Sequence, residues 1–272
     1  MPTIFEREPA FFGRVHRKRF PLPDLPNDEM VRYVWDVEDI RDLMSKRAWM
    51  QSNFQRQEEL DQIWVCQPEN LQTASYGSNW GFYVGKQEIK RWYVDEFRQH
   101  LETMKSTYQK AHSDLPASLA QGCCCMFPTT TPLIRVARDG KNAKGVWYVI
   151  GQRTTLSQDG IHADARWISG RLFGEFIKES DGWKLWHLLD LNDMNYEAGG
   201  DFSQVPTYVP RGTDIMEIEF GKPTLPMLVH DTTYNWADNY PNMPEPYETY
   251  IPEESYGPEG HPIHCYKREV SK

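Results

Sequence analysis

The chain lacks the segments that mark a membrane or secreted protein. No apolar run approaches the roughly 20 residues that a membrane-spanning helix needs. The N-terminal stretch MPTIFEREPAFFGRVHRKRF has no apolar core of the kind found in a signal peptide. We therefore expect a soluble, cytoplasmic protein with no membrane partner.

The sequence is also short of positive charge and of cofactor motifs. Thirty Lys and Arg stand against 39 Asp and Glu, which gives a formal net charge of −9. Nucleic acids are bound by basic surfaces, so we expect no nucleic-acid partner. No P-loop, dinucleotide fingerprint, G-x-S-x-G, zincin or EF-hand pattern occurs, and we predict no cofactor.

The few cysteines are poorly spaced for metal binding. There are five, and three of them are the consecutive residues 123–125. Neighbouring residues of an extended chain point in opposite directions, so this run does not converge on one ion. An odd total suits reduced thiols. His261, His264 and Cys265 lack a second ligand pair, and we predict no metal site.

What the chain has in excess is aromatic side chains, including ten Trp and fourteen Tyr. Such an excess suits either a deep apolar pocket or a large interface, and composition alone does not choose between them. The 272 residues have room for one domain of about 150 residues with a substantial extension.

Four successive β-strands are predicted between residues 129 and 191. The runs are rich in β-branched and aromatic residues and are separated by turns with Lys-Gly or Asp-Gly. Alternation in the last run places Trp183, Leu185, His187 and Leu189 on one face. His187 is then the imidazole in an otherwise apolar row.

The elements before these strands are predicted from their hydrophobic periodicity. Residues 28 to about 57 show an amphipathic helical stripe, and a short helix follows over 57–65. The stripe consists of Val31, Val34, Trp35, Val37, Ile40, Leu43, Met44, Arg47 and Met50. Residues 71–85 read as a hairpin. Residues 86–112 form a long amphipathic helix.

Three regions follow from this pattern. Residues 1–27 are punctuated by Pro and form an N-terminal arm, and 28–195 form the domain. Residues 196–272, rich in Pro and Tyr, are expected to run as an extended strap over the domain, its cavity or a partner. The strand 163–179 is apolar on both faces, so its outer side also needs cover and a homodimer or higher homo-oligomer is expected.

The order of the elements resembles that of the NTF2-like, or SnoaL-like, superfamily. Three strings carry the resemblance: IRDLMSKRAWM, TPLIRVARDGKNAKGVWYVIG and DGWKLWHLLD. It covers roughly residues 30–195. The resemblance implies an α+β fold, in which a curved antiparallel sheet wraps against about three helices to form a cone. The apolar cavity of such a cone holds a small molecule.

The resemblance also implies a class of function. We expect a cofactor-independent enzyme that acts on a hydrophobic cyclic or aromatic small molecule by acid–base proton transfer, as a dehydratase, isomerase or related lyase. The alternative is a binding or assembly protein without catalysis. The acid–base dyad of many relatives is incomplete here: the first helix carries Arg47, Trp49, Ser52 and Asn53 in the neighbourhoods where relatives carry Tyr and Asp.

Candidate site residues follow from the residue types and the resemblance. His187 is the candidate general acid or base, because a neutral imidazole can both take and give a proton. Arg47 would stabilise an enolate or bind a carboxylate or phenolate, and Tyr148 would donate a hydrogen bond to a substrate oxygen. Each also has a purely structural interpretation, as a core His, a flanking Arg or a core Tyr. The predicted substrate-binding residues are Tyr33, Trp49, Asn53, Phe127 and Trp167.

Overall fold

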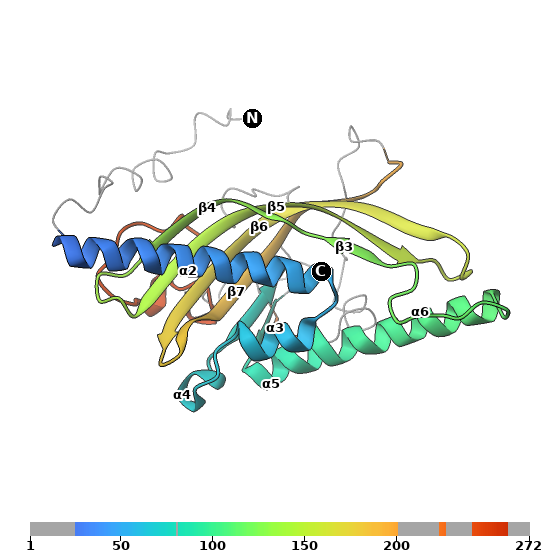
Figure 1. Ribbon diagram of the computed structural model, residues 1–272, viewed down its shortest axis with the longest axis horizontal. Coiled ribbons are helices and arrows are strands. Elements are labelled where there is room, and N and C mark those ends of the chain that lie inside the picture. Colours follow the sequence, from blue (N-terminus) through green and yellow to red (C-terminus); the bar gives the residue numbers. More distant parts are fainter. Residues whose placement is uncertain (1–24, 80, 201–222, 227–240, 261–272) are drawn as a thin grey trace, which may run out of the picture.

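The computed structural model describes residues 25–79, 81–200, 223–226 and 241–260 of the chain (Figure 1). The N-terminal arm expected over residues 1–27 lies almost wholly outside the described residues, as do His261, His264 and Cys265. The family resemblance predicted an α+β fold with a curved sheet against a few helices, and this architecture is confirmed.

Helices form where the sequence showed an amphipathic period. The predicted helix over residues 28–57 is two helices, because the chain turns at Phe54, which has a positive φ of 59°. The segments α5, η2 and α6 follow one another without a break, and η2 is the π-helical part of this long helix. The bounds are α2 Asn27–Ser52, α3 Arg56–Gln62, α4 Pro68–Leu71, α5 Lys86–Ile89, η2 Lys90–Glu96 and α6 Phe97–Ala111. No helix among the described residues is long and apolar enough to cross a membrane.

One open, eight-stranded sheet carries the fold. The neighbours run in the order β3-β5-β6-β7-β1-β2-β8, and β4 also pairs with β5. The sheet is not wholly antiparallel as expected, because β1 lies parallel to β7. The bounds are β1 Ser75–Ser78, β2 Gly81–Val84, β3 Cys124–Met126, β4 Thr129–Val136, β5 Asn142–Leu156, β6 Ala163–Glu179, β7 Gly182–Glu197 and β8 Leu225–Pro226.

The helical segments α2, α3, α5 and η2 pack on the concave face of this sheet (Figure 1). Ile40, Met44 and Leu60 from the helices meet Trp147 and Leu172 from the strands in one buried cluster. Because the strand ladder is regular, alternate residues of β5 and β6 turn to this face and the residues between them turn to the convex face. The interior of the cone therefore lies between this face and the α2, α3 and η2 segments.

The convex face is partly covered by residues 241–260, which we call the C-terminal segment. Tyr256 is 2% exposed and packs against Phe173, Leu189 and Leu191. Backbone hydrogen bonds from residues 138 and 139 to residues 247 and 248 fix the segment against the turn after β4. The described part of the expected strap thus contacts the domain on the side away from the helices.

A β-bulge in β7 changes the faces that strict alternation predicted. Phe176 pairs with Leu185, yet the preceding Glu175 pairs with His187, so Trp186 is an extra residue. Leu185 lies in the concave cluster, whereas Leu189 lies in the convex cluster. The prediction that His187 shares a face with Leu185 is therefore wrong.

Candidate functional site

The interior contains an ion pair between two helices. Arg47 projects from the buried stripe of α2 and is 1% exposed, and its Nε lies 3.1 Å from Oε1 of Glu59 in α3, which is fully buried. Burial by itself lowers the pKa of Arg47, but the combined charge interactions with Glu59, Tyr93, Tyr76 and Asp190 outweigh it and raise the pKa above its ordinary value. The guanidinium is therefore a permanent cation inside the cone.

Glu59 is held by two further donors. The hydroxyl of Tyr93 donates to Oε2 at 2.6 Å, and the indole N–H of Trp64 donates to Oε1 at 3.4 Å. Tyr93 comes from η2, and local π-helical turns of this kind recur at functional sites. All the oxygens of Glu59 are thus engaged within the protein, which makes it a partner for Arg47 rather than a reactive group.

A second carboxyl group lies on the concave face of β7. Oδ2 of Asp190 accepts a hydrogen bond of 3.0 Å from the hydroxyl of Tyr76 in β1. Burial raises the pKa of Asp190, although the positive charges of Arg47 and Arg56 oppose this. Burial also raises the pKa of Tyr76 well above its usual range, so its hydroxyl stays protonated and remains a donor.

Aromatic rings fill the space around these groups. Tyr76 stacks on Tyr93 at 5.3 Å and on Trp64 at 6.1 Å between ring centres, and Trp92 stacks on Tyr83 at 4.1 Å. Such surroundings exclude water and strengthen every charge–charge interaction among Arg47 and the two carboxyl groups. Part of the aromatic excess of the sequence therefore surrounds this ion pair.

A family model described as the SnoaL-like domain matches residues 32–188, more than half of the chain. The chain belongs to the SnoaL-like family. No curated protein sequence matches it.

Solved structures include two similar proteins. One is an NTF2-like protein with a cystatin-like fold from Novosphingobium aromaticivorans, with 16% identity, TM-score 0.40, and coverage of 67% of this chain and 96% of that one. Another is the hexachlorocyclohexane dehydrochlorinase LinA-type3 from Novosphingobium barchaimii LL02, with 13% identity, TM-score 0.43, and coverage of 63% and 95%. Identities this low carry no conclusion about the reaction of this SnoaL-like protein.

The structure places His187 outside the interior of the SnoaL-like domain. Its ring lies on the convex side, where Nδ1 is 2.8 Å from the Ser75 hydroxyl and the backbone of Gly257 covers the ring. Burial lowers the pKa of His187 to about 3, so the imidazole is neutral near pH 7. These contacts are those of a core histidine that joins β1, β7 and the C-terminal segment.

The other predicted site residues are divided between the two faces. Arg47 lies in the interior, and Tyr33 and Phe127 pack half-buried against the concave cluster. Trp49 is 73% exposed on α2, and Asn53 is exposed and caps that helix by donating to the Trp49 carbonyl.

Two predicted site residues face outward from the sheet. Tyr148 and Trp167 are 52% and 42% exposed on the convex face, where the Arg171 guanidinium lies over the Tyr148 ring. Neither of them meets Arg47. The expected homo-oligomer remains a prediction, and exposed apolar side chains remain on this face: Met126, Tyr148, Ile150, Trp167 and Met194.

Sequence reasoning missed Glu59, Tyr76, Tyr93 and Asp190. Asp190 could have been found from its place at the end of the largely apolar WKLWHLLD string, whereas Glu59 carried no signal, because α3 reads RQEELDQ and is polar almost throughout. Tyr76 and Tyr93 carried no signal, because a Tyr in a hairpin or an amphipathic helix is ordinarily a packing residue.

Among the described residues, one group of side chains has the composition of a metal site. Ligand atoms of Cys66, Glu179 and Asp181 lie within 4.8 Å of one another. The Glu179 carboxylate, however, already accepts hydrogen bonds from the Cys66 backbone N–H and thiol and from the Asn70 amide. This carboxylate joins the end of β6 to the N-terminal end of α4, and we assign it no metal.

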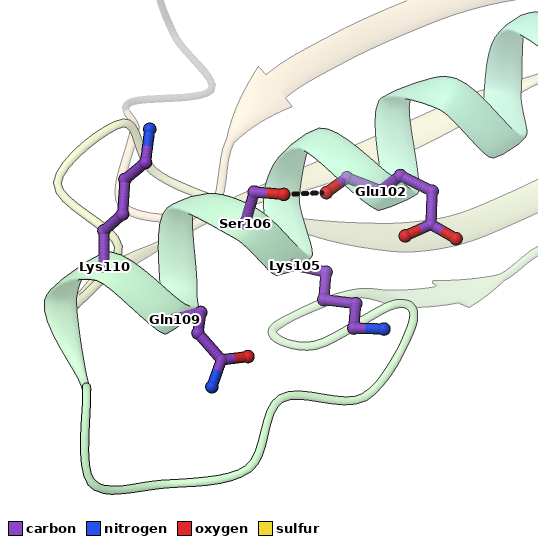
Figure 2. A pocket seen from close by; sticks show the side chains of 5 residues that line it. All are labelled: Glu102, Lys105, Ser106, Gln109 and Lys110. Atoms are coloured by element: carbon purple, nitrogen blue, oxygen red, sulfur yellow. Dashed lines mark hydrogen bonds between the residues drawn. The ribbon is translucent and has the colours of Figure 1, made fainter.

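A surface hollow on α6 is shown in Figure 2. Its lining is polar and comes from one helix: Glu102, Lys105, Ser106, Gln109 and Lys110. The Ser106 hydroxyl donates to the Glu102 carbonyl of the same helix, and no aromatic ring lines the hollow. It therefore lacks the apolar walls expected of a site for a hydrophobic ring.

Proposed function

We propose that this SnoaL-like protein is a cofactor-independent enzyme that moves a proton on a hydrophobic cyclic or aromatic small molecule. The reaction class is a dehydration, an isomerisation or a related elimination. The observation that supports the proposal is the buried hydrogen bond between Tyr76 and Asp190, with Arg47 beside it. The catalytic role assigned to His187 from the sequence passes to Asp190.

Asp190 has the properties of a general acid–base group. Burial raises its pKa, and the residue as a whole is only partly buried. Carboxyl groups whose pKa is shifted by burial are concentrated at functional sites. A carboxyl whose pKa is raised toward neutrality takes a proton from carbon or gives one to a leaving hydroxyl more effectively than an exposed one.

Tyr76 and Arg47, which lie next to Asp190, would orient its carboxyl group and stabilise the charge that forms on the substrate. The Tyr76 hydroxyl orients the carboxyl group by donating to Oδ2. The Arg47 guanidinium is placed to stabilise negative charge that develops on a substrate oxygen as the proton moves. The rings of Tyr93 and Trp64 are at most 1% exposed, so a cyclic substrate contacts them only where these rings shift to admit it.

The alternative, a binding protein without catalysis, has one observation in its favour. The interior is largely occupied by the chain's own aromatic side chains, with Trp64, Tyr83 and Tyr93 at most 1% exposed. A protein of this kind would hold its ligand without altering it.

The two functions are separated by Asp190→Asn, which keeps the shape and removes the titrating proton. With a substrate found by screening cyclic hydroxy-carbonyl compounds, we expect turnover to fall about 10²- to 10⁴-fold with ligand affinity little changed. The matched control is Asp164→Asn, an exposed position on β6. Full turnover in a folded Asp190→Asn protein would remove Asp190 from the mechanism.

A further inference from the structure

The interior cation Arg47 has donors that the described protein does not use. Its Nε faces Glu59, but its buried Nη2 has no hydrogen-bond partner among the described residues. Leaving a buried guanidinium N–H unpaired is unfavourable, because the group has lost its water and gained nothing in return. An acceptor from outside the chain would satisfy it.

A second guanidinium enters the same space from the start of α3. Arg56 donates from Nη1 to the Tyr93 carbonyl at 3.0 Å, and its buried Nε has no partner among these residues. Its charged carbon lies 4.4 Å from the centre of the Tyr93 ring and 3.3 Å from that of Phe97. Cationic N–H groups and flat aromatic faces are thus presented together.

The net charge of this interior depends on whether Asp190 is ionised or protonated. The charged groups acting on Asp190 are Arg47 from α2 and Arg56 from α3, and Tyr76 from β1 is its hydrogen-bond donor. Glu59 neutralises one of the two cations. An ionised Asp190 therefore gives a neutral interior, whereas a protonated Asp190 leaves one unbalanced positive charge.

We propose that the interior binds a flat aromatic acid as its carboxylate, on the free N–H groups of Arg47 and Arg56, and that Asp190 takes up a proton when it binds. A planar carboxylate matches the forked donors of a guanidinium, and an aromatic ring matches the surrounding rings. A new anion next to Asp190 disfavours its ionised form, and proton uptake restores the charge balance. This inference rests on the proposed function, in which Asp190 is the proton carrier, and it names the substrate class.

The test is calorimetric titration of the full chain with benzoate and with the neutral isostere benzamide. We expect benzoate to bind at least tenfold more tightly near pH 7, with net proton uptake revealed by buffers of different ionisation enthalpy. Affinity should fall as pH rises, by up to tenfold per pH unit, because a proton is bound together with the ligand. Equal binding of the two probes would overturn the proposal.

Three variants sharpen the result. Arg56→Gln should abolish the preference for benzoate, whereas Arg41→Gln, an exposed position on α2, should keep it. Asp190→Asn should bind benzoate at least as tightly as the wild type, without proton uptake. Uptake that persists in folded Asp190→Asn would also overturn the proposal.

The two proposals fail in different ways. Proton-linked benzoate binding in a protein whose turnover does not depend on Asp190 would remove the proposed catalysis and keep the anion site. Asp190-dependent turnover of a neutral ring compound, with no preference for benzoate, would remove the anion site and keep the catalysis.

Discussion

The sheet carries a buried cluster of charged groups on each of its two faces, and the two clusters differ in the hydrogen-bond partners that surround them. On the concave face Arg47 pairs with Glu59, and Asp190 lies beside them. On the convex face Nζ of Lys144 lies 3.4 Å from Glu175, and both side chains are at most 8% exposed. Each face thus places a cation and a carboxylate where water is scarce.

The convex cluster is closed by the C-terminal segment. The Ser255 hydroxyl donates to Glu175 at 2.5 Å, and the ammonium of Lys144 donates to the Glu254 carbonyl. Ser255 Oγ in turn accepts the Gly257 backbone N–H at 2.9 Å. The charged pair is therefore bound by donors and acceptors of one segment, and its evident use is to hold that segment on the sheet.

Burial raises the pKa of Glu175 as it does that of Asp190. A raised pKa therefore does not by itself distinguish a site from a structural contact. Buried atoms without a hydrogen-bond partner among the described residues occur on both faces, and on the convex side they include Glu175 Oε1 and Nε2 of the neutral His187. What distinguishes the concave side is that its unpartnered atoms include guanidinium donors, on Arg47 and Arg56, next to Asp190, a residue that keeps some accessible surface.

The largest effect is expected from breaking the concave ion pair. Glu59→Gln leaves the Arg47 guanidinium buried without a counter-charge, and we expect the free energy of unfolding to fall by about 3–5 kcal/mol. The neighbouring Glu58 is exposed on the same helix, so Glu58→Gln is the matched control with little expected change. Urea denaturation of both variants measures the difference. Equal stability of the two would mean that Glu59 does not neutralise Arg47.

A smaller and more local effect is expected on the convex face. Ser255→Ala removes a donor to the buried Glu175 carboxylate, which costs about 1–3 kcal/mol. Because the segment is held at this point, hydrogen exchange should rise over residues 241–260 while the amides of β1 and β7 stay protected. Glu253→Ala, at an exposed position of the same segment, is the control. Uniform loss of protection would show that the segment and the sheet unfold as one unit.

The sequence predicted the elements well, because their signals are local. The hairpin at residues 71–85, the long helix at 86–112 and the four strands all appear. Periodicity also identified the inward stripe of α2 through Ile40, Met44 and Arg47. It failed for Val31, Val34 and Trp35, which are exposed, since an apolar period does not say how far a helix extends beyond its sheet.

The site was harder to predict, because it depends on contacts between distant elements. Asp190 and Tyr76 meet only because β1 pairs with β7 in parallel, a register that no local pattern announces. The bulge at Trp186 turned His187 to the convex face, and one extra residue of this kind reverses every later side chain of the strand. Arg47 was identified because a charge in an apolar stripe is visible in the sequence.

The smallest effect near pH 7 is expected at His187, whose response to pH sets the convex face apart from the concave one. His187→Gln keeps much of the volume and a hydrogen bond to Ser75, so we expect a loss of about 1 kcal/mol at pH 7. The folded pKa of about 3 lies below the ordinary value of 6.5, so protonation favours the unfolded chain. The stability of the wild type should therefore fall as pH drops below 6.5, by about 2 kcal/mol at pH 5 from this group alone.

The Gln variant lacks this titration, so the two stability curves should cross between pH 7 and pH 5. Asp190 and Glu175 have raised pKa values and act in the opposite sense, because protonation stabilises the folded state for each. They are present in both proteins, and the difference between the curves isolates His187. Melting temperatures measured at half-unit steps of pH give that difference. Parallel curves would show that His187 is accessible to protons in the folded protein, and the convex face would then be the more open of the two.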